Sequence, residues 1–357
     1  MNIKKLVKPE ILSLKTYNAK EIPCRVKLDA NESPYSAFSI QSPQATRRGE
    51  RSAFSVEKIF KTLNRYPDPE AMELKKVLSK NLGLKPENIL LGNGSDELIY
   101  YLITTFGGPV LYPVPTFSMY GIISQALGEK GIAVSLDREF DIDIKKTMNA
   151  IKKEKPKLIF LSSPNNPTGN CFSSDKILKV IDVSKGLVVV DEAYQPFSSE
   201  RGFLPLLRDY KNLVIMRTLS KIGLAGLRVG FLIADAGIIK EVNKVRLPFN
   251  VNSWSQAIAV SALRDKKRLN AAIRTIIQER ERLFVEMEKI KGTRPYPSEA
   301  NFILFKVKNA DKVYKGLLKR GVLVRNMKGV VDGCLRVTVG TENENKLFLE
   351  ALKGAIR

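Results

Sequence analysis

The run Leu213-Val214-Ile215-Met216-Arg217-Thr218-Leu219-Ser220-Lys221 joins four consecutive apolar residues to a turn of small and polar residues. Apolar runs of this length, bounded by turn residues, are typical of strands that are buried on both faces. The chain continues into Gly226-Leu227-Arg228-Val229-Gly230, where a second apolar run begins. The stretch 213–233 therefore predicts two buried strands with a lysine and an arginine in the connection between them.

Apolar runs of the same kind recur along the preceding part of the chain and alternate with longer amphipathic stretches. The runs predict buried strands at Ile89–Leu91, Val110–Tyr112, Leu158–Leu161, Leu187–Val190, Leu213–Met216 and Val229–Ile233. Helical spacing of apolar residues predicts helices at 96–106, 116–127, 142–153 and 174–184. This alternation favours an α/β fold with a mainly parallel central sheet flanked by helices, in which ligands gather at the carboxyl ends of the strands.

The pattern changes beyond Lys244, where strands and helices no longer alternate regularly. Helices are predicted at 253–264, 267–290, 310–320 and 343–356, and strands at 300–307, 322–325 and 334–339. We expect an N-terminal arm over residues 1–45, a large domain over 46–245, and a smaller α+β domain over 246–357 against which the arm packs. The basic segment 36–55 has no clear periodicity and is predicted to be a surface loop.

Composition restricts both the class of protein and the chemistry available to it. The chain has 357 residues, enough for a large and a smaller domain, and no apolar stretch reaches the ~18 residues that a membrane span needs. It contains no histidine, which excludes Ser-His and Cys-His catalysis and argues against a transition-metal site. The widely spaced Cys24, Cys171 and Cys334 predict reduced thiols, and no secretory signal is evident, so a cytoplasmic protein is expected.

The formal net charge of +22 has two interpretations. One is a nucleic-acid-binding protein, since so basic a chain attracts phosphates. The other is an enzyme with a lysine-rich surface and anionic ligands. Lys and Arg are spread along the whole chain, and the densest arginine cluster, Arg47, Arg48 and Arg51, lacks interleaved aromatic residues. The second interpretation is favoured, so neither nucleic acid nor a membrane is expected as a partner.

Three polar residues follow predicted strands and are therefore expected at one edge of the sheet. Asn166 lies in the turn Asn165-Asn166-Pro167-Thr168-Gly169, Asp191 begins Asp191-Glu192-Ala193-Tyr194, and Lys221 follows Ser220. Each has a plain structural explanation on its own: turn formation for Asn166, a helix N-cap for Asp191 and a solvated surface charge for Lys221. Their joint occurrence after strands of one sheet favours a shared binding site.

In these motifs, and in Gly92-Asn93-Gly94-Ser95-Asp96-Glu97, the chain resembles the fold type I pyridoxal-phosphate aminotransferases. Among them it is most similar to the histidinol-phosphate aminotransferases, from Leu28-Asp29-Ala30-Asn31-Glu32-Ser33-Pro34 to Leu335-Arg336-Val337-Thr338-Val339-Gly340-Thr341. The resemblance implies pyridoxal phosphate as cofactor and transamination between L-histidinol phosphate and 2-oxoglutarate in histidine biosynthesis. Two alternatives of the same fold stay open, an aromatic-amino-acid aminotransferase and a threonine-phosphate decarboxylase.

The resemblance also assigns contacts to the cofactor. Lys221 would link to the cofactor aldehyde and transfer the substrate's proton, and Asp191 would pair with the pyridinium nitrogen. Tyr194 and Asn166 would hydrogen-bond the phenolic oxygen. Phe117 would stack on the ring, with an ordinary core phenylalanine as the alternative. The phosphate would be bound by the backbone N–H groups of Ser95, Asp96 and Glu97, by the hydroxyls of Thr218 and Ser220, and by the guanidinium of Arg228.

Further residues are implied for substrate binding and assembly. Arg325 and Arg336 form a pair suited to a dianionic phosphate. Tyr17 and Asn301 are additional candidates for the same substrate site. Tyr66 resembles the tyrosine that reaches the cofactor phosphate of a partner subunit, which implies a homodimer. The expected small-molecule partners are a phosphorylated amine and 2-oxoglutarate.

Overall fold

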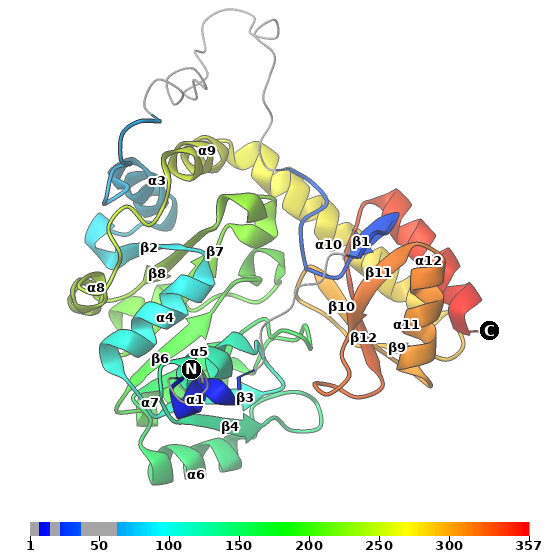
Figure 1. The fold of residues 1–357 in the computed structure, drawn as a ribbon, viewed down its shortest axis with the longest axis horizontal. Helices are drawn as coiled ribbons and strands as arrows, with labels where there is room; N and C mark the ends of the chain where they lie inside the picture. The colour runs from blue at the N-terminus through cyan, green and yellow to red at the C-terminus, as the bar shows by residue number, and fades with distance from the viewer. Residues whose placement is uncertain (1–6, 15–21, 37–62, 357) are drawn as a thin grey trace, which may run out of the picture.

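The computed structural model describes residues 7–14, 22–36 and 63–356, which form two lobes (Figure 1). The larger lobe contains a seven-stranded sheet and the smaller a five-stranded sheet. Helix α10 (Lys266–Glu288) extends from one lobe to the other. The basic segment 36–55 lies, except for its first residue, outside the described residues. In the described part of the chain, no helix combines the length and apolar character needed to cross a bilayer.

The larger sheet has the strand order β2-β8-β7-β6-β5-β3-β4. Its strands are β2 (Ile89–Asn93), β3 (Val110–Val114), β4 (Gly131–Ser135), β5 (Leu158–Ser162), β6 (Leu187–Asp191), β7 (Leu213–Thr218) and β8 (Val229–Ile233). The strands from β7 to β4 pair in parallel, whereas β8 runs antiparallel to both of its neighbours. The predicted α/β fold with a mainly parallel central sheet is confirmed.

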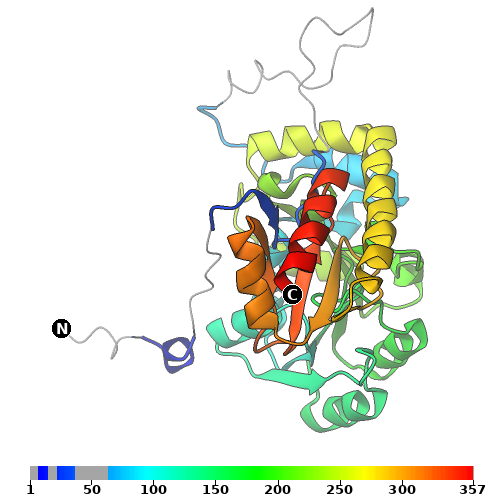
Figure 2. The ribbon, with the colours of Figure 1, turned by 90° about the vertical axis from the view of Figure 1, so that its right-hand side faces the viewer.

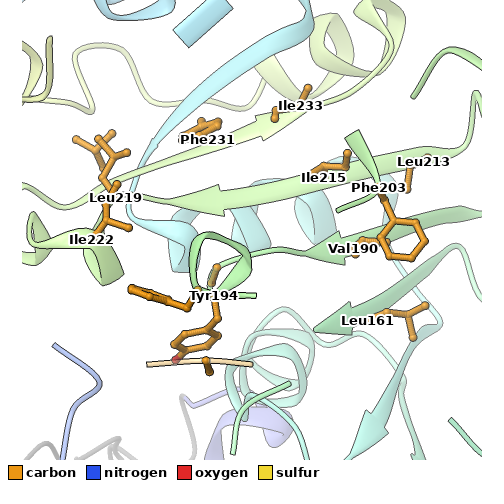
Figure 3. Packing of buried hydrophobic residues seen from close by; sticks show 14 of the residues in the cluster. Leu161, Val190, Tyr194, Phe203, Leu213, Ile215, Leu219, Ile222, Phe231 and Ile233 are labelled. Carbon is orange, nitrogen blue, oxygen red and sulfur yellow. The ribbon is translucent and has the colours of Figure 1, made fainter. Parts of the chain in front are cut away.

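Helices cover both faces of this sheet, because successive side chains of a strand point to opposite faces. One core cluster joins Val189 to α4, α5 and α8, and the other joins Val188 and Val190 to α3, α6, α7 and α9. Figure 3 shows the second cluster, with Ile215 on β7 and Leu219 beyond the end of that strand. The helices are α3 (Met72–Leu82), α4 (Ser95–Phe106), α5 (Met119–Ala126), α6 (Ile144–Glu154), α7 (Ser174–Val183), α8 (Ala236–Asn243) and α9 (Ser253–Arg264).

The smaller sheet has the strand order β1-β11-β12-β10-β9. Its strands are β1 (Val26–Leu28), β9 (Thr293–Pro295), β10 (Phe302–Val307), β11 (Val322–Asn326) and β12 (Cys334–Thr338). Strand β1 belongs to the N-terminal segment and pairs in parallel with β11. Helices α11 (Ala310–Lys319) and α12 (Glu342–Ile356) lie side by side over this sheet (Figure 2). The domain boundaries at residues 45 and 245 stay predictions, and α9 packs against α3 of the larger lobe.

Most predicted elements lie within a few residues of the observed ones, and the strand 229–233 and the helix 253–264 have the predicted bounds. The sequence patterns do not predict β1, β4, β9, α3 or α8. In the edge strand β4 only Val134 is buried, so the strand lacks a continuous apolar run. The remaining elements are the short helices α1 (Pro9–Leu12), η3 (Pro86–Asn88), η4 (Gln195–Phe197), η5 (Leu204–Arg208), η6 (Ser220–Ile222) and η7 (Ala225–Leu227).

Candidate active site

The polar residues predicted to share a site are brought to one edge of the larger sheet. The parallel strands β5, β6 and β7 end at Ser162, Asp191 and Thr218. Asn166 follows β5 in a turn, and Lys221 lies in the single turn η6 directly after β7. Because the carboxyl ends of adjacent parallel strands meet at the same edge, three separate segments of the chain contribute to one site.

Asp191 is a buried carboxylate held by two neutral hydrogen-bond donors. It is 4 % exposed. The Tyr120 hydroxyl donates to Oδ2 at 2.6 Å, and the Ala193 backbone N–H donates to Oδ1 at 3.1 Å. Burial raises the pKa of Asp191 to about 6, although both hydrogen bonds and the nearby charge of Lys221 act to lower it. A carboxylate in this position favours a cationic N–H as a ligand, because such a group would compensate its buried charge.

Lys221 and Tyr194 lie together near this carboxylate. The Lys221 Nζ is 5.8 Å from the centroid of the Tyr194 ring. The Tyr194 hydroxyl accepts a hydrogen bond from Asn31 Nδ2 at 2.9 Å, and its ring packs edge-on against Phe302 at 5.1 Å. Asn31 comes from the N-terminal segment and Phe302 from the smaller lobe, so both lobes contribute to the surroundings of one phenol.

A cradle for an anion lies before α4. Gly94 has a φ of 87°, and a Cβ added to it would lie 2.4 Å from Arg228 Nη2. A Cβ added to Gly230 would lie 2.8 Å from the Gly94 carbonyl carbon, so the two backbones are in contact. Gly230 pairs with Thr218 across the strands, and the Thr218 hydroxyl is 3.0 Å from that of Ser220. Two hydroxyls and a guanidinium beside a helix start suit a phosphate.

The first turn of α4 completes this cradle. The helix begins at Ser95, as the predicted anion site requires. Asp96 Oδ2 lies 3.4 Å from Arg228 Nη2, which connects the turn to the guanidinium. Glu97 Oε2 accepts the Asn93 backbone N–H at 2.6 Å, so its side chain fastens the residues before the helix. The backbone N–H groups at a helix start lack partners within the helix and are therefore available to an anion.

Arg336 connects the smaller lobe to Asn166. Its Nη1 donates to Asn166 Oδ1 at 2.5 Å, and its Nη2 donates to the Asp29 carbonyl at 2.8 Å. Its guanidinium carbon is 5.1 Å from the centroid of the Phe302 ring. Arg325 lies directly opposite Arg336 across β11 and β12. Directly opposed residues of antiparallel strands lie on the same face of a sheet, so the predicted arginine pair shares one face.

Two further predicted residues contact groups that hold the site. Asn301 is fully buried, and its Nδ2 donates to the Asn31 carbonyl at 3.1 Å. Its Oδ1 is buried without a hydrogen-bond partner among the described residues, as expected of an acceptor that faces a ligand. Phe117 is half-buried and meets the Tyr120 ring edge-on at 5.7 Å.

Tyr66 is not packed among these residues. Its side chain is 81 % exposed and stacks on Phe249, with the ring centroids 4.5 Å apart. In the single chain, Tyr66 is therefore exposed to solvent and does not line the chain's own site. Tyr17, the remaining candidate, lies outside the described residues.

Three residues of the site are not identified from the sequence: Tyr120, Asn31 and Phe302. Tyr120 follows Phe117 by three residues, a spacing that places two aromatic rings on one side of a helix start. Asn31 lies within the quoted motif 28–34 and adopts a left-handed φ of 54°, a conformation in which asparagine is enriched. Phe302 comes directly after the predicted Asn301. Their closeness in sequence to predicted site residues or to a quoted motif is the signal by which these three residues can be found.

Comparison with known proteins gives consistent matches. The family model of aminotransferase class I and II matches residues 25–352. A histidinol-phosphate aminotransferase of Aquifex aeolicus is 46 % identical over 99 % of this chain and 98 % of its own length. The structure of the histidinol-phosphate aminotransferase from Clostridium acetobutylicum is similar with a TM-score of 0.82 and 26 % identity, over 93 % of this chain and 99 % of that one. The Sinorhizobium meliloti enzyme in complex with pyridoxal-5'-phosphate has a TM-score of 0.82 and 25 % identity, over 98 % and 97 % of the two chains.

Proposed function

The chain belongs to the aminotransferase class I and II family, and on this basis we propose that it is a pyridoxal-phosphate-dependent histidinol-phosphate aminotransferase. It transfers an amino group from L-histidinol phosphate to 2-oxoglutarate, giving imidazole acetol phosphate and glutamate, in histidine biosynthesis. The observation that carries the proposal is the likeness to histidinol-phosphate aminotransferases over nearly the whole chain.

The described residues fit pyridoxal phosphate. The buried carboxylate of Asp191 suits a pyridinium N–H, and the Arg228 guanidinium, packed closely against Gly94 before α4, suits a phosphate. The Lys221 amine near the Tyr194 ring suits the aldehyde. When bound, the cofactor supplies an aldehyde that combines with amines and a ring that accepts electrons.

Each residue of the larger lobe then has a defined task in the proposal. The Lys221 Nζ would hold the cofactor by its aldehyde, and as a free amine it would take the proton from the amine-bearing carbon of the substrate. Asp191 would keep the ring nitrogen protonated, and Tyr194 and Asn166 would hydrogen-bond the phenolic oxygen. Phe117 packs on the ring. The phosphate would be held by the backbone N–H groups of Ser95, Asp96 and Glu97, by the hydroxyls of Thr218 and Ser220, and by the Arg228 guanidinium.

The substrate is bound from the smaller lobe. Arg325 and Arg336 share a face of the sheet, and two guanidinium groups match the charge of a phosphate monoester. The 2-oxoglutarate that replaces the donor also ends in an anionic group that Arg336 can bind. Asn301, with its buried Oδ1, and Tyr17 are the further candidates for this site.

We infer that two copies of the chain assemble. Tyr66 and Phe249 are stacked and exposed by 81 % and 37 %, and Leu247 nearby is 63 % exposed. Exposed apolar groups that cluster in this way are typical of an interface. In the proposed homodimer Tyr66 donates to the cofactor phosphate of the second copy. A cytoplasmic location fits the three cysteines, all of which are free thiols.

A panel of amino donors tests the proposal. Purified protein with pyridoxal phosphate and 2-oxoglutarate is given L-histidinol phosphate, histidinol, phenylalanine, tyrosine or threonine phosphate, and glutamate and carbon dioxide are measured. We expect the fastest glutamate formation from histidinol phosphate. Faster turnover of the aromatic amino acids, or carbon dioxide from threonine phosphate, would instead support one of the two alternatives.

A further inference from the structure

The Tyr120 hydroxyl makes a buried hydrogen bond that core packing does not require. The ring of Tyr120 stacks on Phe160 with centroids 4.8 Å apart and meets Phe117 edge-on at 5.7 Å. A phenylalanine would make both of these contacts. The hydroxyl, which is buried with the rest of the side chain, donates to Asp191 Oδ2 at 2.6 Å. The hydroxyl therefore adds the hydrogen bond to Asp191, beside a weaker interaction with the Ser162 side chain.

The bond has a fixed direction, from phenol to carboxylate. Burial and the charge of Asp191 raise the pKa of Tyr120 well above its ordinary value of 10, so the hydroxyl retains its proton. The same bond acts to lower the pKa of Asp191, against the effect of burial. Since each carboxylate oxygen can accept two hydrogen bonds, Asp191 keeps capacity for a further donor.

The position of Tyr120 in the fold ties this bond to the cofactor site. Tyr120 lies in the first turn of α5, and its backbone N–H donates to the Phe117 carbonyl at 3.4 Å. A single turn of the chain therefore carries both Phe117 and the Tyr120 hydroxyl that donates to Asp191. We propose that Tyr120 is a positioning residue, whose hydroxyl holds the Asp191 carboxylate in the orientation that pairs with the ring nitrogen of pyridoxal phosphate. The inference rests on the proposed function.

Removal of the hydroxyl alone tests the inference. Dissociation constants are measured for Tyr120→Phe and for the wild type with pyridoxal phosphate and with its 1-deaza analogue, in which a C–H replaces the ring nitrogen. The variant is expected to bind pyridoxal phosphate more weakly, on the order of tenfold to hundredfold, as for the loss of a hydrogen bond to a charged group. Affinity for the analogue should not change, because the analogue cannot pair with Asp191.

Tyr112→Phe is the matched control. The Tyr112 ring belongs to the same aromatic cluster, 6.4 Å from that of Tyr120, but its hydroxyl lies beside Gly121. This variant should bind both cofactors as the wild type does. Equal losses for both cofactors in Tyr120→Phe would show a packing role only, and no loss for either would also overturn the inference. A wild type that does not bind pyridoxal phosphate would overturn the proposed function itself.

A second substitution keeps the test valid should Tyr120→Phe fail to fold. Site-specific 3,5-difluorotyrosine at position 120 retains the ring and the hydroxyl but makes the hydroxyl a stronger donor. The preference for pyridoxal phosphate over the 1-deaza analogue should then increase. An unchanged preference in a folded protein would overturn the inference.

Discussion

Asp191 is 4 % exposed, and burial raises the pKa of its carboxyl group to about 6. The buried Oδ1 of Asn301 has no hydrogen-bond partner among the described residues, and Arg228 adopts a left-handed φ of 53°. Each of these three features costs free energy in the chain alone, and features of this kind are common at functional sites. A ligand that brings a cation to Asp191 and an anion to Arg228 would offset part of this cost.

The free energy of unfolding of the cofactor-free protein should depend on whether the Asp191 carboxyl group is protonated. Its folded pKa of about 6 is above the ordinary 3.8, so the folded chain holds this proton more tightly than the unfolded chain does. The stability that this group provides is complete well below pH 3.8 and is lost well above about pH 6, and its total is roughly 3 kcal/mol. Asp191→Asn does not titrate and avoids this loss.

We therefore expect the free energy of unfolding of Asp191→Asn, relative to wild type, to increase by roughly 2 kcal/mol between about pH 4 and about pH 7. Urea denaturation of both cofactor-free proteins measures it. Carboxyl groups common to the two proteins cancel in the difference, and the chain has no histidine that could titrate in this range. A difference that does not depend on pH would contradict the assignment.

Helix α4 is flanked by two glycines that have similar backbone conformations but different neighbours. Gly94 precedes the helix with φ 87° and ψ 169°, and Gly107 follows it with φ 69° and ψ −164°. Both conformations belong to a region that is essentially restricted to glycine. They differ in what a Cβ would meet: Arg228 Nη2 at 2.4 Å for Gly94, and Glu129 Oε1 at 3.2 Å for Gly107.

Gly94→Ala and Gly107→Ala should both lower the free energy of unfolding by roughly 1–3 kcal/mol, because each forces alanine into a conformation that favours glycine. Only Gly94→Ala displaces the Arg228 guanidinium. Its affinity for pyridoxal phosphate should therefore fall on the order of tenfold to hundredfold, while that of Gly107→Ala should stay near the wild-type value. Equal affinities in the two variants would show that the cradle before α4 does not bind the phosphate.

The register of β11 and β12 places Arg325 and Arg336 opposite each other. If both bind the substrate's phosphate, removal of either should weaken donor binding by roughly 2–5 kcal/mol, more for histidinol phosphate than for histidinol. Binding of both donors to Arg325→Met and Arg336→Met measures this. Arg294→Met, an exposed position on β9 of the same sheet, is the control. Equal losses for the two donors would argue against phosphate recognition by the pair.

Elements and strand-end residues could be predicted because they depend on local patterns. The buried strands are continuous apolar runs, and Asp191 and Lys221 follow two of them in sequence. The bonds from Tyr120 to Asp191 and from Asn31 to Tyr194 could not be predicted in this way, since they join residues 71 and 163 positions apart. Such pairs arise from how helices pack on the sheet and how the lobes meet, which no local pattern encodes.

At the scale of the whole molecule, the chain presents Tyr66 outward while its cofactor residues face inward. If Tyr66 completes the site of a second copy, mixtures of Lys221→Ala with an impaired Tyr66→Ala variant should regain activity. Each mixed dimer then has one site with both residues intact and one that lacks both. Activity after subunit exchange, confirmed by mass spectrometry of mixed dimers, measures this. Confirmed exchange without activity above that of either parent would exclude Tyr66 from the partner's site.

In the proposed function, Lys221 holds pyridoxal phosphate at this site. Borohydride reduction of the cofactor-loaded protein, followed by peptide mass analysis, tests it most directly. We expect one reduced cofactor per chain on Lys221 in the wild type and in Lys211→Ala, a control in which the substituted lysine pairs with Asp235 on the surface. We expect no lysine-linked cofactor in a folded Lys221→Ala. A reduced cofactor on a different lysine of the wild type, or one retained in Lys221→Ala, would contradict it.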